Sequence, residues 1–167
     1  LLGRTRYLKW YQQPNSTDRA EAERWLEMMS LEHLAQSSFM TLSGGQKQLV
    51  LIAQALTSEC NLLILDEPSS ALDLQNQEKL FSILNELQEV KSLTVIFSTH
   101  DPNHAFHFCN LLIMLGFSKH YCGNCQQIMT SQLLNEIYNV NFEEFFWNEG
   151  DLKYFVHVPT SPPQTPR

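Results

Sequence analysis

Short apolar runs alternate with helical patterns along most of this 167-residue sequence. The runs LLIL at 62–65, LTVIFST at 93–99 and LLIML at 111–115 are typical of strands. Between the first two runs, helical spacing is kept by Leu80, Ile83, Leu84, Leu87 and Val90. This alternation predicts an α/β fold with a sheet and right-handed crossovers. Since LLIL shows no polar alternation, both faces of that strand are predicted to be covered, as in a parallel sheet.

The opening stretch is helical and does not fit the alternation. Turn and N-cap signals in PNSTDR precede a helical pattern that includes Trp25 and Met29, and a second short helix is expected over Leu31–Gln36. After a glycine pair, Leu49 and Leu56 lie on one face of a further helix. The opening stretch is therefore predicted to be a small helical subdomain.

Four regions are predicted along the chain. Residues 1–41 form the helical subdomain, 42–140 the core with the sheet, and 141–158 a C-terminal extension. The stretch PTSPPQTPR at 159–167 has four prolines in nine residues, so it is predicted to be a disordered tail.

The charge and hydropathy of the chain exclude several classes of function. A net charge of −7 argues against nucleic acid or an anionic membrane surface as the main partner. The apolar runs are far shorter than the roughly 18 residues that span a bilayer. The first ten residues are basic and aromatic, unlike a signal peptide.

The four cysteines suit a reducing compartment. Cys60 and Cys109 stand alone in apolar surroundings and are predicted to be buried thiols. Cys122 and Cys125 have the spacing of a metal knuckle, but a structural zinc needs four ligands and the sequence holds no second such pair. A hairpin turn that holds two thiols is the favoured interpretation, and a metal-binding fold is the alternative.

The stretch TLSGGQKQ at 41–48 places a serine and two glycines at the mouth of a helix. Backbone N–H groups in the first turn of a helix have no internal partner and carry partial positive charge. Glycines there let a phosphate approach the backbone, and Ser43 adds a hydroxyl donor. The alternative is that Ser43 caps the helix and the glycines shape a turn.

Acidic and imidazole side chains follow two of the predicted strands. Asp66 and Glu67 come directly after LLIL, at the carboxyl end where open α/β sheets bind ligands. Adjacent side chains on a strand point in opposite directions, so one carboxylate can hold Mg²⁺ while the other orients a water. His100 lies at the end of the next strand. The alternatives are carboxylates that begin a loop and a structural histidine.

Four motifs in this order resemble the nucleotide-binding domain of ABC-type ATPases. They are LSGGQ at 42–46, LLILDEP at 62–68, SALD at 70–73 and STHD at 98–101. The resemblance runs from about residue 1 to residue 140. It implies a P-loop NTPase-like sheet, of which this chain holds the C-terminal part with a small helical subdomain.

The resemblance also implies roles for individual residues. The signature motif, which contacts the γ-phosphate of ATP held by the opposite subunit, would consist of Ser43, Gly44, Gly45 and Gln46. Asp66 would serve Mg²⁺, Glu67 would polarise the hydrolytic water, Asp73 would belong to the D-loop at the dimer interface, and His100 would reach the γ-phosphate. ATP and Mg²⁺ are thus the expected cofactors, and positioning and charge neutralisation supply most of the rate.

Two departures from the family pattern limit this reading. Gln54 replaces the arginine that usually follows the signature. The phosphate loop G-x-x-x-x-G-K-[ST] does not occur in the 167 residues, since no glycine is followed by lysine. The Q-loop and the adenine-stacking aromatic residue would precede Leu1. The chain is therefore expected to be a piece of a longer protein and to be inactive alone.

Weaker features resemble one branch of the family. LLGRTRYLKW at the start, LDLQNQ after the D-loop and Asn103 in HDPNHA resemble ATPases of importers for iron-siderophore, haem, cobalamin and molybdate. This implies a head-to-tail dimer with a second ATPase subunit and a membrane permease docked on the helical subdomain. It also implies a cytoplasmic site at the inner face of the cell membrane. The alternatives are an inactive truncated gene product and a soluble ABC-type ATPase, which would carry heptad insertions or basic tracts.

Overall fold

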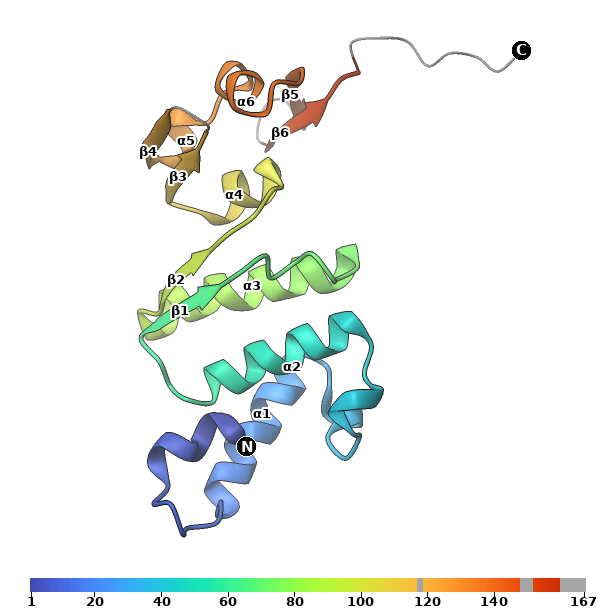
Figure 1. Cartoon of the computed structure of the whole chain (residues 1–167), viewed down its shortest axis with the longest axis vertical. Coiled ribbons are helices and arrows are strands. Elements are labelled where there is room, and N and C mark those ends of the chain that lie inside the picture. Colours follow the sequence, from blue (N-terminus) through green and yellow to red (C-terminus); the bar gives the residue numbers. More distant parts are fainter. Residues whose placement is uncertain (117–118, 148–151, 160–167) are drawn as a thin grey trace, which may run out of the picture. The chain divides into compact units, whose positions relative to one another are not determined.

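Helices and short sheets make up two compact units, Leu1–Ser98 and Thr99–Arg167, in the computed structural model of the chain (Figure 1). The structure describes residues 1–116, 119–147 and 152–159. The predicted tail at 159–167 lies almost wholly outside the described residues. The predicted divisions after residues 41 and 140 fall inside the two units and stay predictions. No helix in the described ranges is long and apolar enough to cross a membrane.

The first unit holds the signature stretch and both predicted parallel strands. Its elements in chain order are η1 (Leu2–Tyr7), α1 (Ser16–Met28), η2 (Glu32–Leu34), η3 (Phe39–Thr41), α2 (Gly44–Leu56), β1 (Leu62–Leu65), α3 (Leu74–Lys91) and β2 (Thr94–Phe97). The long helices begin at the residues that carry cap signals. The second predicted helix is only the 3₁₀ turn η2, because so short a segment makes too few hydrogen bonds to offset helix nucleation.

β1 and β2 pair in parallel, with Leu62 opposite Thr94 and Leu65 opposite Phe97. The prediction that both faces of β1 are covered is wrong. Leu63 is buried, whereas Leu62 is 49% exposed and Ile64 is 69% exposed. Successive side chains of a strand point to opposite faces, and α3 covers only one of them. The opposite face stays open and apolar.

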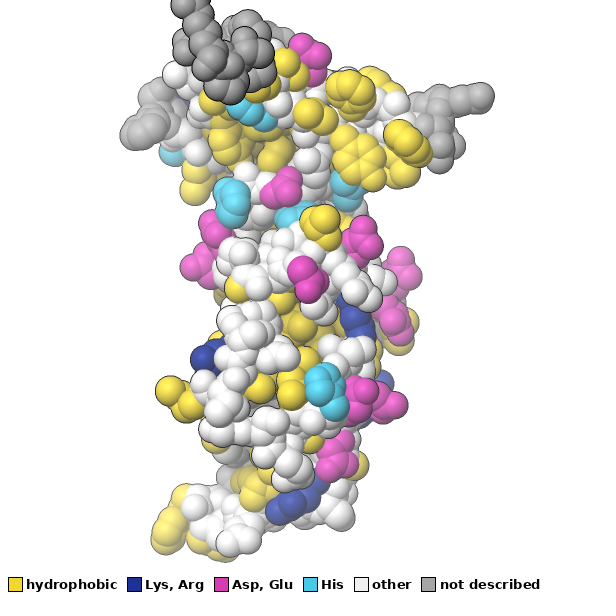
Figure 2. All heavy atoms as spheres, turned by 90° about the vertical axis from the view of Figure 1, so that its right-hand side faces the viewer, with side chains coloured by type: hydrophobic (Ala, Val, Ile, Leu, Met, Phe, Trp, Pro, Cys, Tyr) yellow, Lys and Arg dark blue, Asp and Glu magenta, His cyan; other side chains and the backbone are white. Residues whose placement is uncertain are grey.

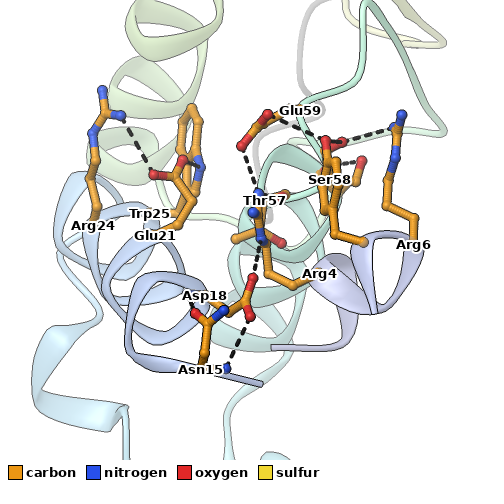
Figure 3. Close-up of polar contacts among 12 residues, drawn as sticks. Arg4, Arg6, Asn15, Asp18, Glu21, Arg24, Trp25, Thr57, Ser58 and Glu59 are labelled. Carbon is orange, nitrogen blue, oxygen red and sulfur yellow. Dashed lines mark hydrogen bonds and ion pairs between the residues drawn. The ribbon is translucent and has the colours of Figure 1, made fainter. Parts of the chain in front are cut away.

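A buried arginine joins the opening turn to α1 and to the end of α2 (Figure 3). Arg4 Nε donates to Asp18 Oδ1 at 3.1 Å. Its Nη1 donates to Glu59 Oε1 at 2.6 Å and to the Thr57 carbonyl at 3.2 Å. The Asn15 N–H and Arg4 hold the pKa of Asp18 below its ordinary value. The Arg4 hydrogen bond likewise lowers the pKa of Glu59.

The second unit contains two antiparallel hairpins and three helices in its described part. Its elements are α4 (Pro102–Phe108), β3 (Leu111–Leu115), β4 (His120–Asn124), α5 (Cys125–Ile128), α6 (Ser131–Tyr138), β5 (Phe142–Trp147) and β6 (Leu152–His157). A small core consists of Ala105, Phe106, Met114, Cys125, Met129, Leu133, Leu134 and Phe155.

β3 departs from the predicted parallel sheet. It pairs antiparallel with β4, with Leu111 opposite Asn124 and Leu115 opposite His120. The four residues between the two strands are enough for a hairpin, whereas a parallel crossover needs a dozen or more. β4 was not predicted, because its alternating residues His120, Cys122 and Asn124 lack the apolar pattern of the other strands.

The cysteine pair is not a hairpin turn. Cys122 lies in β4 opposite Ile113, and Cys125 begins α5, where its buried Sγ donates to the Ala105 carbonyl at 3.3 Å. Within the described residues, no group of three or more His, Cys, Asp or Glu is placed to hold a metal ion. All four cysteines are free thiols, and Cys60 and Cys109 are half-buried rather than fully buried. Burial raises the pKa of Cys109 to about 11.

Candidate functional site

The signature stretch forms the start of α2 and is open to solvent. Ser43 is the N-cap, where its Oγ accepts from Gln46 N at 3.2 Å and its N–H donates to Gln46 Oε1 at 3.0 Å. Ser43 and Gly44 are exposed. The N–H groups of Gly44 and Gly45 have no acceptor in the part of the chain that the structure describes. Ser43 therefore caps the helix, as the alternative interpretation of this stretch has it, and two donors at the positive end of the helix remain available to an anion.

The second glycine packs against the loop that follows the acidic pair. A Cβ at Gly45 would lie 2.8 Å from the Ala71 carbonyl oxygen, whereas one at Gly44 would meet only the Ala71 Cβ at 3.9 Å. Gln77 Nε2 holds this loop from α3, since it donates to the Ser69 and Leu72 carbonyls at 3.0 Å each. The signature turn and the loop at 67–73 therefore touch directly.

The two carboxylates lie at the carboxyl end of β1, as predicted. Ser98, just after β2, donates from its Oγ to Asp66 Oδ1 at 2.5 Å and accepts from the Glu67 N–H at 2.9 Å. Glu67 has a φ of 43°, a left-handed conformation that is uncommon and strained for a residue other than glycine. The Ser98 hydroxyl thus ties the acidic pair to the neighbouring strand.

Asp66 fits the role of a magnesium ligand. Its carboxylate is exposed, and Ser98 occupies only one of the two oxygens in the recorded hydrogen bonds. Mg²⁺ is commonly bound by one or two carboxylates together with substrate phosphates and waters. A single accessible carboxylate at this strand end therefore suits the ion without a larger protein cage.

Asp73 caps α3, because its Oδ1 accepts from the Asn76 N–H at 2.9 Å. The side chain is exposed at the end of the loop that Gly45 contacts. His100 belongs to the second unit, where it is exposed and its carbonyl accepts from the Tyr138 hydroxyl at 3.3 Å. The signature turn, the acidic pair and Asp73 therefore lie in the first unit, whereas His100 lies in the second.

Sequence reasoning missed two residues that shape this site. Ser98 and Gln77 stand inside the motifs STHD and LDLQNQ, yet neither received a role. Only their positions could have indicated a role. Ser98 places a hydroxyl at a strand end beside two carboxylates, and Gln77 places an amide one turn into a helix that follows a loop. Such positions suit side chains that hydrogen-bond to loop backbone.

A parallel strand pair with carboxylates at its carboxyl end and a helix start opened by glycines are features with which α/β proteins bind phosphate-containing ligands. Residues 4–70 match the family model described as ABC transporter. The chain is 40% identical over 158 residues to the molybdate import ATP-binding protein MolC of Haemophilus influenzae, covering 93% of this chain and 62% of that protein.

Two further comparisons agree. A probable iron chelatin transport ATP-binding protein of Helicobacter pylori is 35% identical, with 93% of this chain and 61% of that protein covered. The solved structure of a putative metal-chelate type ABC transporter in an inward-facing conformation matches with a TM-score of 0.85 at 36% identity. That match covers 95% of this chain and 64% of the other.

The chain belongs to the ABC-type ATPases and has the α/β fold of their ATP-binding cassettes. The predicted family and fold class are confirmed. The chain spans about six tenths of the length of these curated relatives, 62% of one and 61% of the other.

Proposed function

We propose that the chain is part of the ATP-binding subunit of an importer for molybdate or for a metal chelate such as an iron-siderophore complex. The observation that carries this proposal is the exposed signature turn, which has free N–H groups at Gly44 and Gly45 and whose second glycine packs against the loop that follows the acidic pair. Relatives named for molybdate import and iron chelatin transport support the substrate class.

The signature turn acts on ATP held by a second subunit. The N–H groups of Gly44 and Gly45 and the Ser43 hydroxyl bind oxygens of the γ-phosphate, while Gln46 keeps the turn in place through its hydrogen bonds with Ser43. No phosphate loop occurs within residues 1–167. As the family resemblance implies, we assign this turn to ATP held by the second subunit of the dimer.

The strand ends supply the hydrolytic chemistry. Asp66 would hold Mg²⁺, and the ion would neutralise part of the triphosphate charge. Glu67 orients the attacking water and accepts its proton, and its backbone is fixed for this task by Ser98. His100 reaches the γ-phosphate, and Asp73 lies at the interface between the two subunits. In-line placement of the water accounts for most of the acceleration.

Two protein partners follow from this assignment. One is a second ATPase subunit in a head-to-tail dimer, which supplies the phosphate loop. The other is a membrane permease, which binds the helical region at 1–41 on the cytoplasmic face of the cell membrane. Closure of the two subunits on ATP drives the permease.

The first test is binding in trans. The chain is mixed with the intact molybdate import ATP-binding protein of Haemophilus influenzae, in which the catalytic carboxylate is replaced by an amide. Complexes are then measured by sedimentation in the presence of MgATP or MgADP. We expect a complex only in MgATP, lost with Ser43→Arg and kept with Ser82→Arg, an equally exposed site within α3. A complex that ignores the nucleotide or the Ser43 substitution would contradict the proposal.

The second test separates a catalytic chain from an inactive one. Purified 1–167 is expected to show no ATP hydrolysis above background, because nothing in it matches the phosphate loop. Hydrolysis that Glu67→Gln abolishes would show that this chain binds the triphosphate by other residues. A soluble non-transport ATPase would instead form the MgATP complex and fail to bind any permease.

A further inference from the structure

One face of the β5–β6 hairpin is apolar and exposed. The strands pair with Glu143 opposite Val156, Phe145 opposite Tyr154 and Trp147 opposite Leu152, so these six side chains share a face. Their exposed fractions are 59% for Phe145, 66% for Trp147, 40% for Leu152, 40% for Tyr154 and 42% for Val156. Hydrophobic side chains gather on the viewed face of this unit in Figure 2.

The other face of the hairpin is already occupied. Phe155 is buried and makes an edge-to-face contact with Phe106 of α4, with ring centroids 5.3 Å apart. Lys153 pairs with Glu144 at 3.0 Å. None of the apolar residues on the open face belongs to the core given above, although the Tyr154 ring contacts His107 of α4, with ring centroids 4.8 Å apart.

In the described residues the β6 edge of the hairpin is occupied, and α6 covers the start of the β5 edge, where the Phe142 N–H donates to Asn135 Oδ1. On β6, the Asn103 side chain bonds both backbone groups of Phe155, at 2.7 Å to its N–H and 3.0 Å to its carbonyl. Phe155 thus points its backbone away from β5, and so does Glu144 opposite it. By the same alternation Phe146 turns its N–H and carbonyl outward. No partner for these groups of Glu144 and Phe146 is recorded in the described residues.

We propose that this edge pairs with a second copy of the chain, β5 against β5 in antiparallel order about a two-fold axis. Such a contact is isologous, because the same edge serves both copies. It places apolar side chains from both hairpins on one face of a continuous four-stranded sheet. The inference does not depend on the proposed transport function.

The charges on β5 select one register. With Phe145 opposite Phe145 of the second copy, Glu144 lies opposite Phe146 and Glu143 opposite Trp147, so five positions pair and no like charges meet. A shift of two residues in one direction places Glu144 opposite Glu144 of the second copy, which is unfavourable because like charges then face each other. The opposite shift leaves only three described positions paired. In the selected register the two Phe145 residues form a pair without backbone hydrogen bonds, in which side chains lie close.

Disulfide trapping tests this register. In the selected pairing the Cα atoms of the two Phe145 residues are about 4.5 Å apart, within disulfide reach. The two Tyr154 residues are three strand spacings apart, about 14 Å. In a Cys122→Ser background, we expect Phe145→Cys to form a covalent dimer under mild oxidation and Tyr154→Cys to stay monomeric. Disulfide formation by both variants, as expected for face-to-face packing or random aggregation, would overturn the proposal. Disulfide formation by neither variant would also overturn it.

A backbone test is independent of side-chain chemistry. Phe146→Pro removes an outward N–H that β6 does not use, whereas Phe146→Ala keeps it. By sedimentation equilibrium we expect Pro to raise the dimer dissociation constant about tenfold relative to Ala, since one hydrogen bond is lost from each copy. Protection of the Phe155 amide against exchange checks that the hairpin remains folded. Equal dissociation constants for Pro and Ala would rule out edge pairing.

Discussion

Single side chains fix the geometry on which the site depends. Ser98 ties Asp66 and Glu67 to β2 with one hydroxyl, and Arg4 binds Asp18, Thr57 and Glu59 together at the base of the helical region. Each of these residues contacts residues that are distant in sequence, so its substitution is expected to destabilise several segments at once.

The Arg4 cluster predicts a pH-dependent stability. Because the pKa values of Asp18 and Glu59 are lowered in the folded chain, their stabilising contribution is present above the ordinary values of 3.8 and 4.5. It is lost as pH falls through the lowered values. We expect Arg4→Met to reduce the melting temperature at pH 7, and the difference from wild type to shrink below pH 4.5. A difference that stays constant down to pH 3 would contradict the ion-pair account.

Asn103 predicts a local effect on β6. Asn103→Leu keeps the size of the side chain but removes both hydrogen bonds to Phe155. We expect the Phe155 amide to exchange about tenfold faster or more, since an unsatisfied partly buried group costs about 1–3 kcal/mol. Exchange at Asn76, which the Asp73 cap protects in the other unit, serves as the unchanged reference.

At the scale of elements, the two glycines at the start of α2 differ in how much space surrounds them. Gly45→Ala places a methyl group 2.8 Å from the Ala71 carbonyl, so we expect a loss of about 1–3 kcal/mol in the free energy of unfolding. Gly44→Ala makes only an ordinary van der Waals contact with the Ala71 Cβ at 3.9 Å, and it is expected to gain about 0.5–1 kcal/mol, because alanine favours the helix. Urea unfolding followed by circular dichroism compares the two. Equal effects would show that the loop yields to a methyl group.

Sequence patterns predicted the elements whose signals are local. The cap signals in PNSTDR and at Ser43 and the apolar face of α2 identify two helices without reference to the rest of the fold, whereas the cap at Asp73 was not predicted. Pairing is not local, so the antiparallel partner of β3 and the open face of β1 were not predicted. The position of Asp66 and Glu67 at the end of a strand was predicted from their motif. The left-handed backbone of Glu67 was not, because it follows from tertiary contacts that no motif contains.

For the whole molecule, the open face of the β1–β2 sheet determines behaviour in solution. Leu62, Ile64 and Ile96 expose 49%, 69% and 54% of their surface, and contiguous apolar patches of this kind bind partners or cause aggregation. We expect the isolated chain to self-associate and to bind a hydrophobic dye.

A matched pair of substitutions tests the role of this face. Ile64→Thr is expected to lower dye binding and aggregation with little loss of stability, because the side chain is exposed. Leu63→Ala, one residue away on the covered face, is expected to cost about 2–5 kcal/mol. Light scattering and dye fluorescence measure the first effect, and urea unfolding the second. A sharply melting, dye-free monomer for the unmodified chain would contradict this account.

The contact between Gly45 and Ala71 also has a mechanical consequence. With no side chain at residue 45 to act as a cushion, the helix start and the loop that ends at Asp73 lie backbone against backbone. If the turn binds phosphate as proposed, any displacement of the glycine turn by the ligand would also displace the adjoining loop, because the two backbones are in contact.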